Sequence, residues 1–325
     1  MTSRLNSNPL LGSGSSFTYH LVAFVVVAIW GSTFVSTKML LLVGLSPAQI
    51  FTLRFIIAYV LLLAYSLIMQ KSGGKPFLLF SKCWQDEVLM FALGITGGTL
   101  YFLTENSAMN YTTTTNTSLI VSLSPLVASF LISLFFRSLR LTRVQALGSL
   151  MAALGVVVVV LNGHFVLHLS PLGDSLAFGA ALCWGFYSML MIPANLKYDT
   201  VFVTRKVFIY GLLAMIPYYL WKPDEATIFT SSLLFSLDLS VYLNLLFLGC
   251  VASMLCFLAW NWVLKKLGAV VATNYVYFNP VTTILFAWAI LSEQITIYFL
   301  LGTTLILLGM FLADRGKSNS REQIP

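Results

Sequence analysis

Three ionisable residues lie inside long apolar stretches of this sequence: Lys38, Arg54 and Glu105. A charge in such surroundings is costly and usually serves a function. In one interpretation Glu105 titrates or contacts a substrate amine, while Arg54 or Lys38 engages a substrate carboxylate. In the other, Arg54 and Glu105 lock two neighbouring helices together, and Lys38 extends its ammonium group to the membrane surface. Both interpretations predict an ion-pair network.

Two prolines and three polar residues form a second set of candidates. Pro125 and Pro280 each remove a backbone donor within a predicted helix and free a carbonyl group one turn earlier. Freed carbonyls can line a cavity or allow a helix to bend. Asn116, Asn274 and Tyr277 are expected to line that cavity. The alternative is ordinary polar packing between helices, which we assign to the neighbouring serines.

Aromatic residues and two asparagines form the third set. An aromatic pocket would suit an apolar or aromatic metabolite, including an amine held by cation–π contact. Packing against other helices, or anchoring at the membrane interface, is the alternative for each aromatic residue. The members of this set are Trp30, Tyr101, Asn106, Trp184, Tyr187 and Asn261.

Common catalytic and cofactor-binding motifs are absent from the sequence. It has no GxSxG, no HExxH and no phosphate-cradling loop. His164 and His168 are four residues apart but not on an expected helix, so they do not predict a metal site. The four cysteines show no metal-ligand spacing. We therefore predict no enzyme activity, no cofactor and no metal.

The composition is that of a membrane protein. Hydrophobic residues make up 58% of the chain and charged residues 9%, whereas a soluble domain has about 25% charged residues. Ten apolar stretches approach or exceed the length of a membrane helix, and backbone in hydrocarbon must be helical. Polar residues 1–20 and 315–325 are predicted to be disordered tails. The stretches are Leu21–Leu42, Pro47–Met69, Val88–Met109, Thr115–Phe136, Val144–Leu161, Leu172–Ile192, Val207–Trp221, Ser240–Leu264, Val270–Leu291 and Thr296–Ala313.

Lysines and arginines set the expected orientation. With a cytoplasmic N-terminus, fifteen of the 18 basic residues fall on the cytoplasmic side, and only Lys38 and Lys222 on the other. Cytoplasmic loops carry such an excess. We therefore predict a multi-pass protein of the cell (inner) membrane with both termini in the cytoplasm. Because the basic residues are spread over short loops, nucleic acid is not an expected partner.

The chain repeats itself after 154 or 155 residues. Each copy, 21–161 and 170–314, holds five predicted helices, and this odd number turns the second copy upside down in the membrane. The charges agree, because the basic loop 137–143 corresponds to residues 292–294, which carry no base. Inverted repeats are typical of secondary transporters, with the substrate site where the copies meet. Matching positions include Trp30-Gly31 with Trp184-Gly185, Gly148 with Gly302, Gly155 with Gly309, and Ser124-Pro125 with Asn279-Pro280.

A set of longer segments also carries a recognisable pattern: Trp30–Leu42, Leu53–Phe55, Tyr111–Leu131, Ser170–Ser188, and Asn279–Thr296 followed by Gly302 and Gly309. Together they resemble the EamA-type members of the drug/metabolite transporter superfamily, from about Leu21 to Arg315. The resemblance implies a ten-helix exporter or exchanger of small metabolites such as amino acids. One position departs from the family: the Glu usual after the fourth helix of each copy is present only as Glu293.

We therefore expect an all-α secondary transporter that moves small organic metabolites, amino acids or related compounds, by alternating access. The resemblance favours export. A passive facilitator or channel is the alternative. A membrane enzyme or receptor ranks below it, because no long loop holds a catalytic set or a soluble domain. The expected partners are the metabolite and the lipid bilayer, with the proton as a candidate coupling ion; the sequence predicts no oligomeric state.

Overall fold

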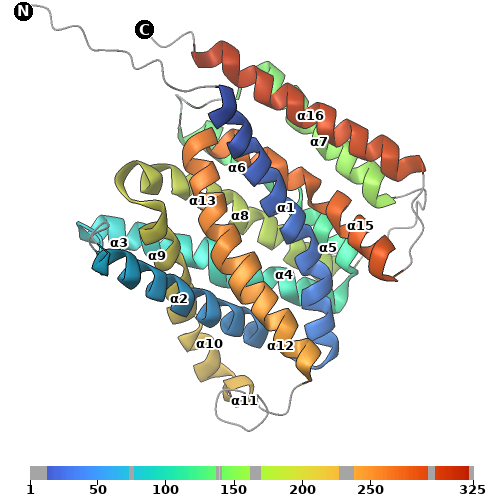
Figure 1. Cartoon of the computed structure of the whole chain (residues 1–325). Coiled ribbons are helices and arrows are strands. Elements are labelled where there is room, and N and C mark those ends of the chain that lie inside the picture. Colours follow the sequence, from blue (N-terminus) through green and yellow to red (C-terminus); the bar gives the residue numbers. More distant parts are fainter. Residues whose placement is uncertain are drawn as a thin grey trace, which may run out of the picture.

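The chain forms a bundle of helices in the computed structural model (Figure 1). The structure describes residues 13–72, 77–136, 139, 141–161, 170–226, 238–291 and 297–321. Within these ranges it has no β-strand, so the predicted all-helical fold is confirmed there. Some sequence predictions fall outside the described residues: those for Arg137, Arg140, His164, His168 and the segment 292–296.

Most helices follow one another with short connections. In chain order they are α1 (Ser13–Leu42), α2 (Pro47–Lys71), α3 (Trp84–Gly94), η1 (Ile95–Thr99), α4 (Leu100–Tyr111), α5 (Thr114–Val121), α6 (Ser124–Phe135), α7 (Arg143–Leu161), α8 (Pro171–Lys197), α9 (Thr200–Leu213), α10 (Ile216–Trp221), α11 (Pro223–Ala226), α12 (Leu239–Leu246), η5 (Phe247–Leu255), α13 (Cys256–Leu267), α14 (Ala269–Asn274), η6 (Tyr275–Phe278), α15 (Asn279–Leu291) and α16 (Ile297–Arg321).

Seven described stretches are long and apolar enough to cross a membrane, judged by length and composition. Two shorter apolar helices, Arg143–Val159 and Ile297–Ala313, correspond to two further predicted segments. The predicted segment Val270–Leu291 is divided among α14, η6 and α15, so it forms no single long helix. The seven are Phe17–Leu42, Pro47–Lys71, Trp84–Tyr111, Asn116–Phe135, Pro171–Lys197, Thr200–Trp221 and Leu239–Leu267.

Local sequence determines where two of these helices begin. At α2 the Ser46 hydroxyl accepts from the Gln49 amide at 3.2 Å, and the Gln49 side chain accepts from the Ser46 amide at 2.9 Å. This reciprocal arrangement satisfies two amides at the helix start, and a proline in the first position removes an amide that has no partner there. At α8 the Ser170 hydroxyl accepts from the Gly173 amide at 3.3 Å, again beside a proline.

Several of the apolar spans contain a break in the α-helix. α5 and α6 are separated at Ser122 and Leu123, just before Pro125, and the 3-10 helix η6 ends just before Asn279 and Pro280. Proline lacks an amide hydrogen and clashes with the preceding turn. Two wider turns, η1 and η5, are π-helical, a form that often occurs at functional sites. Both predicted helix-bending prolines therefore follow a break.

Helix extends into the segments that the sequence assigned to tails. Within the described residues, 13–20 and 315–321 are helical, although 1–20 and 315–325 were predicted to be disordered. Once a helix has formed, each added residue gains a hydrogen bond at low entropic cost, because only nucleation is expensive. α1 and α16 therefore continue beyond their apolar parts.

α9 also begins earlier than the sequence predicted. Asp199 caps it, accepting from the Val201 amide at 3.3 Å, and the helix starts at Thr200. Arg205 and Lys206, which the sequence placed in a loop, are therefore helical and buried. The predicted stretch Val207–Trp221 begins too late because it leaves out the charged residues before it. The sequence alone does not show that a charged side chain such as that of Lys206 has a partner.

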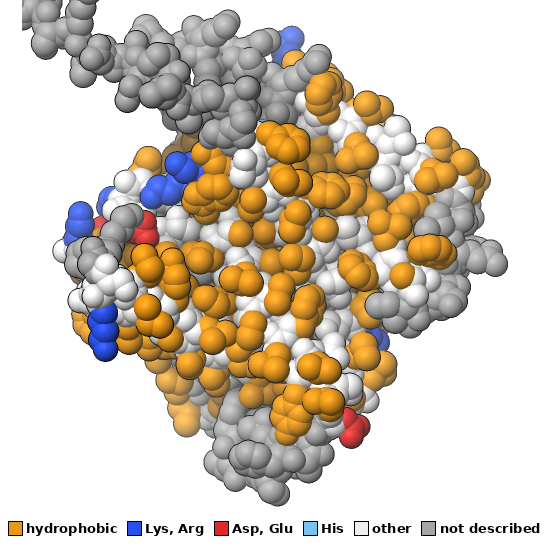
Figure 2. Space-filling model, viewed as in Figure 1, with side chains coloured by type: hydrophobic (Ala, Val, Ile, Leu, Met, Phe, Trp, Pro, Cys, Tyr) orange, Lys and Arg blue, Asp and Glu red, His pale blue; other side chains and the backbone are white. Residues whose placement is uncertain are grey.

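Lys206 and Lys197 have their partners in the first turn of α3, whereas Arg205 donates to the Leu78 carbonyl. Glu87 pairs with Lys206, and Asp86 pairs with Lys197 at 2.5 Å. The two carboxylates therefore tie α3 to α8 and α9 at one end of the bundle, which we call the basic end. Figure 2 shows Lys and Arg side chains gathered at the edge where α2 ends and α3 begins, whereas the middle of the visible face is hydrophobic or uncharged.

α7 and α16 pack side by side on the outside of the bundle (Figure 1). A Cβ atom built on Gly155 would lie 2.7 Å from the carbonyl oxygen of Gly302, and one built on Gly148 would lie 2.6 Å from that of Gly309. Both distances are shorter than real Cβ contacts, so only glycine permits this approach. Small residues allow such close helix packing in membranes.

We predict that Gly155→Ala destabilises the protein whereas Gly179→Ala does not. At Gly155 the added methyl group meets backbone, but at Gly179 it meets only the Thr104 side chain at 3.7 Å. Overpacking typically costs about 1–3 kcal/mol. Thermal unfolding of both variants in detergent measures this difference; equal melting temperatures would show that the α7–α16 contact does not need glycine.

Candidate functional site

A small cavity lies where helices from both parts of the chain meet. Its volume is about 20 Å³, enough for one water molecule. Two hollows of about 500 and 550 Å³ are larger, but both lie at the basic end. The small cavity is the stronger candidate site because buried charged and polar groups converge on it. Its lining residues are Trp30, Thr33, Phe34, Arg54, Tyr101, Phe102, Glu105, Val121, Ser124, Trp184, Phe257, Val276 and Asn279.

Glu105 is the acidic residue of the cavity, and α4 also supplies its partner. Tyr101 lies one turn earlier, and its hydroxyl donates to Glu105 Oε1 at 2.8 Å. Residues four apart share one face of a helix, so the spacing of these two residues brings the phenol to the carboxyl group. This hydrogen bond fixes the orientation of the Glu105 carboxyl group inside the bundle.

Arg54 is the basic residue of the cavity and lies on α2. Its Nε donates to the Ser253 hydroxyl at 2.8 Å, and its guanidinium carbon lies 4.3 Å from the centre of the Phe102 ring. Ser253 belongs to the π-helical turn η5. The arginine is therefore held by one hydrogen bond and one cation–π contact.

The two charges face the same small space without touching. Arg54 is 2% exposed and Glu105 is 7% exposed. Among the described residues, no ion pair within 4.0 Å joins them. Arg54 and Glu105 thus offer charges of opposite sign to one cavity, and the direct contact predicted from the sequence is not formed in this conformation.

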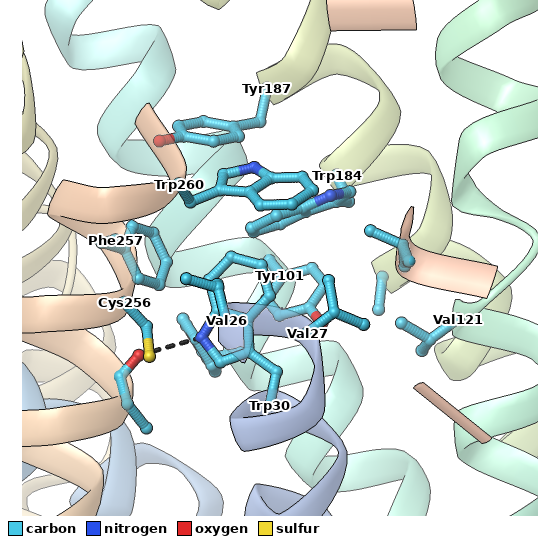
Figure 3. Packing of buried hydrophobic residues seen from close by; sticks show 14 of the residues in the cluster. Val26, Val27, Trp30, Tyr101, Val121, Trp184, Tyr187, Cys256, Phe257 and Trp260 are labelled. Carbon is cyan, nitrogen blue, oxygen red and sulfur yellow. Dashed lines mark hydrogen bonds between the residues drawn. The ribbon is translucent and has the colours of Figure 1, made fainter. Parts of the chain in front are cut away.

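Aromatic rings make up much of the rest of the wall. The rings of Trp30 and Trp184 are 5.2 Å apart at 90°, and the Tyr101 ring is 5.1 Å from that of Trp184. Figure 3 shows these rings close together, with Trp260 and Phe257 beside them. Edge-to-face contacts of this kind stabilise aromatic clusters. The cavity therefore combines one charged side with an aromatic side.

Three polar atoms of lining residues have no hydrogen-bond partner among the described residues. They are Trp184 Nε1, Ser124 Oγ and Asn279 Oδ1, and all three are buried. By contrast, Trp30 Nε1 donates to the Ala252 carbonyl at 2.9 Å. Most buried polar groups are paired, so each exception calls for a physical reason. Here three exceptions border one cavity.

Eight of the thirteen lining residues form pairs that are 154 or 155 positions apart. The members of one such pair therefore occupy matching places in the two copies of the repeat. Arg54, Tyr101 and Glu105 have no such partner in the lining. At 155 residues after Glu105 the chain has Trp260. The pairs are Trp30 with Trp184, Phe102 with Phe257, Val121 with Val276, and Ser124 with Asn279.

Five of the predicted site residues thus line the cavity: Trp30, Arg54, Tyr101, Glu105 and Trp184. The sequence did not single out Phe102, Phe257, Val121 or Val276. Their spacing of 155 residues was the available signal, because it is also the spacing between Ser124-Pro125 and Asn279-Pro280.

Two predicted residues form a buried network behind the aromatic wall. The Tyr187 hydroxyl donates to Asn261 Oδ1 at 2.5 Å, and Asn261 Nδ2 donates to the Thr204 hydroxyl at 2.9 Å. Tyr187 also contacts Trp184, with ring centres 5.1 Å apart. Neither Tyr187 nor Asn261 lines the cavity. They hold α8, α9 and α13 together.

The remaining predicted residues lie elsewhere, each in its own contacts. Lys38 Nζ donates to the Met109 carbonyl at 2.7 Å, so its ammonium group ties α1 to α4. Asn106 Nδ2 donates to the Pro47 carbonyl at 3.4 Å, and Asn116 Nδ2 donates to Asp174 Oδ1 at 2.6 Å. Asn274 Oδ1 accepts from the Ser149 hydroxyl at 3.2 Å. Tyr277 is fully buried.

Metal binding has no support in the part of the chain that the structure describes. There, no group of three or more His, Cys, Asp or Glu side chains could hold a metal ion. The cavity has the chemical groups needed to bind a small molecule. It offers a carboxyl group, a guanidinium group, hydrogen-bond donors and acceptors without partners among the described residues, and aromatic faces.

The chain is similar to known membrane transporters over most of its length. An uncharacterized transporter of Archaeoglobus fulgidus is 27% identical over 91% of this chain and 98% of its own. A Salmonella typhimurium protein named "probable amino-acid metabolite efflux pump" is 26% identical over 90% of this chain and 93% of its own. A protein of known crystal structure has the same fold, with a TM-score of 0.65 at 20% identity over 91% of this chain and 97% of its own.

The EamA-like transporter family matches two ranges of the chain, residues 17–161 and 171–313. These ranges cover more than half of the sequence and contain every residue that lines the cavity. The chain therefore belongs to the EamA-like transporter family, with two copies of that family's domain, and is a membrane transporter and not an enzyme.

Proposed function

We propose that this protein is a secondary transporter that moves a small organic metabolite by alternating access, with the substrate bound in the central cavity. The composition of the cavity lining is the main support for this proposal. Matching residues of the two copies form a mostly apolar frame, and Arg54 and Glu105 add opposite charges to it. A buried charge inside a membrane bundle is costly, and such charges usually mark a substrate or ion pathway.

The proposal includes ten membrane helices arranged as two inverted five-helix repeats, 21–161 and 170–314. Reciprocal contacts between α7 and α16 support this arrangement. Gly148 meets Gly309, and Gly155 meets Gly302. Since Gly148 matches Gly302 in the repeat and Gly155 matches Gly309, each contact is the counterpart of the other. A two-fold axis produces such reciprocal contacts, and inverted transporter repeats have one in the membrane plane.

The proposed orientation places both termini and the basic end in the cytoplasm, in a protein of the cell (inner) membrane. Lys197, Arg205, Lys206 and Lys265 belong to this end, whereas Lys38 and Lys222 belong to the other. Basic residues near span ends favour the cytoplasmic side. The hollows of about 500 and 550 Å³ are then cytoplasmic.

A route from the cytoplasm supports alternating access. The hollow of about 500 Å³ includes Ile132 and Met191 in its lining. These residues lie two turns along α6 and α8 from Ser124 and Trp184, which line the cavity. The hollow therefore extends towards the cavity along two shared helices and stops short of it.

Hydrogen bonds close the opposite end in this conformation. Lys38 joins α1 to the end of α4, and Asn116 joins α5 to Asp174 at the start of α8. The cavity itself holds about 20 Å³, far less than the roughly 300–1,000 Å³ of small-molecule pockets. Substrate binding therefore requires helix movement, and the breaks at Ser122–Leu123 and η6 are where the helices can bend.

The proposed substrate class is amino acids and related metabolites. A carboxyl group beside Arg54 and an amine beside Glu105 would satisfy both buried charges, while the aromatic rings would contact an apolar side chain. The name of the Salmonella typhimurium relative, "probable amino-acid metabolite efflux pump", supports this class and favours export. We propose the proton as the coupling ion, carried by Glu105.

We predict that Glu105→Gln lowers transport about ten- to hundredfold, the equivalent of the roughly 1.5–3 kcal/mol lost with a charged hydrogen-bond partner. It is also expected to abolish the response to a pH gradient, because the amide cannot exchange a proton. Uptake into proteoliposomes, with and without an imposed pH gradient, measures both. Amino-acid substrates found by thermal stabilisation of the purified protein supply the assay.

Asp238→Asn is the matched control, because Asp238 is exposed and outside the cavity. Its transport should equal that of the parent. If Glu105→Gln transports and binds like the parent, the coupling role of Glu105 is wrong. If the parent itself shows no response to a pH gradient, proton coupling is wrong and the passive facilitator becomes the favoured alternative.

The two equivalent tryptophans should respond differently to replacement by phenylalanine. Trp30→Phe removes the hydrogen bond to the Ala252 carbonyl and should lower stability by about 1 kcal/mol. Trp184→Phe removes a donor that has no partner among the described residues, so stability should be retained. Its apparent substrate affinity should instead fall about fivefold, the equivalent of one hydrogen bond.

Thermal unfolding and substrate titration of both variants test this difference. The opposite pattern, with Trp184→Phe destabilised and its substrate affinity unchanged, would exclude the Trp184 indole as a substrate donor.

A further inference from the structure

A second hollow, of about 550 Å³, lies at the basic end and away from the central cavity. Its walls come from the end of α2, the segment 77–82, and the junction of α8 and α9. No lining residue is shared with the central cavity. The lining consists of Tyr65, Ser66, Met69, Phe77, Leu78, Lys82, Lys197, Tyr198, Asp199, Val201, Phe202 and Arg205.

Three cations border this hollow. Arg205 lies with its guanidinium carbon 3.9 Å from the centre of the Phe77 ring and donates one N–H to the Leu78 carbonyl. A guanidinium group has five donors, so others are available for a ligand. The Lys197 side chain is 54% exposed even though it pairs with Asp86. Lys82 is exposed, and no described residue accepts a hydrogen bond from its ammonium group.

The acidic groups beside the hollow leave a positive balance. Asp199 caps α9 through the Val201 amide, and Asp86 takes one side of Lys197. These two carboxylates face three cations, Lys82, Lys197 and Arg205. The hollow therefore favours an anion.

The other walls are mostly apolar, and several of their side chains are exposed. Tyr65 is 41% exposed and Met69 43% exposed, on the last turns of α2 before that helix ends at Lys71. Leu78 is 44% exposed beside them. Phe80, in the same segment, is 66% exposed, and Trp84, the first residue of α3, is 78% exposed. Exposed aromatic residues at a helix end mark the level of the membrane interface.

We propose that this hollow binds the headgroup of an anionic glycerophospholipid. The phosphate would lie among Lys82, Lys197 and Arg205, and the first part of an acyl chain would run along Tyr65 and Met69. Basic pockets between membrane helices are suited to anionic headgroups. A soluble anion would use the cations but not the exposed apolar wall, so the occupant is the lipid.

The bound lipid would join α2 to the junction of α8 and α9. These helices come from the two separately matched ranges of the chain. The lipid is therefore expected to stabilise the contact between them, independently of any transported substrate.

The test measures thermal unfolding of the purified full chain in a neutral detergent. Dioleoylphosphatidylglycerol is titrated against dioleoylphosphatidylcholine, and glycerol 3-phosphate provides the headgroup without acyl chains. We expect phosphatidylglycerol to raise the melting temperature in a saturable manner, and the other two compounds to do so weakly or not at all. Lys82→Gln should weaken phosphatidylglycerol binding about fivefold, the effect of one basic residue near an anionic lipid.

Lys71→Gln is the matched control, because Lys71 is an exposed cation at the same end of α2 that does not line the hollow. It should bind phosphatidylglycerol like the parent. Equal stabilisation by both lipids, equal stabilisation by glycerol 3-phosphate, or an equal loss in Lys71→Gln and Lys82→Gln would each overturn the proposal. A failure of transport with this lipid response intact would count against the proposed function alone.

Discussion

Hydrocarbon offers no hydrogen-bond partner to a backbone amide, and this constraint organises the molecule. The described apolar stretches are helical for this reason, and a break in a helix needs another group to satisfy the freed backbone. The breaks at Ser122–Leu123 and in η6 lie next to lining residues of the central cavity, Ser124 and Val276. At these two breaks the irregular backbone borders the cavity. The same two helix breaks therefore provide polar groups for a solute and positions at which the helices can bend.

The same constraint explains the chemistry of the cavity. A charge buried among helices persists only with partners, and Arg54 and Glu105 have theirs in Ser253, Phe102 and Tyr101. Their mutual attraction is not used up in a direct contact. We infer that the matching residues of the two copies provide a symmetric and mostly apolar frame that either side of the membrane can reach. The first copy adds the charges, whereas the second has Trp260 at the position that matches Glu105.

Much of the fold follows from the sequence, because apolar length and proline position act locally. The sequence also selected Trp30, Arg54, Tyr101, Glu105 and Trp184, which all line one cavity. It could not show that Arg54 bonds Ser253, or that Asn116 bonds Asp174, because helix rotation and rotamers decide such contacts. The sequence predicted that the seventh apolar stretch begins after Lys206, because a lysine was not expected inside it. In the structure α9 already includes Lys206, whose buried charge is paired with Glu87. The apolar lining residues Phe102 and Phe257 were recognisable only from their spacing of 155 residues.

Access to the cavity from the two sides tests the central claim most directly. Cysteine is placed at Ser124 or at Asn279, matching positions of the repeat, after Cys83, Cys183, Cys250 and Cys256 have been replaced. A membrane-impermeant thiol reagent is then applied to one face of sealed vesicles at a time. Alternating access predicts that each cysteine reacts from both faces, and that a bound substrate slows both reactions. Reaction of either cysteine from one face only, with or without substrate, would contradict a cavity that both sides reach in turn.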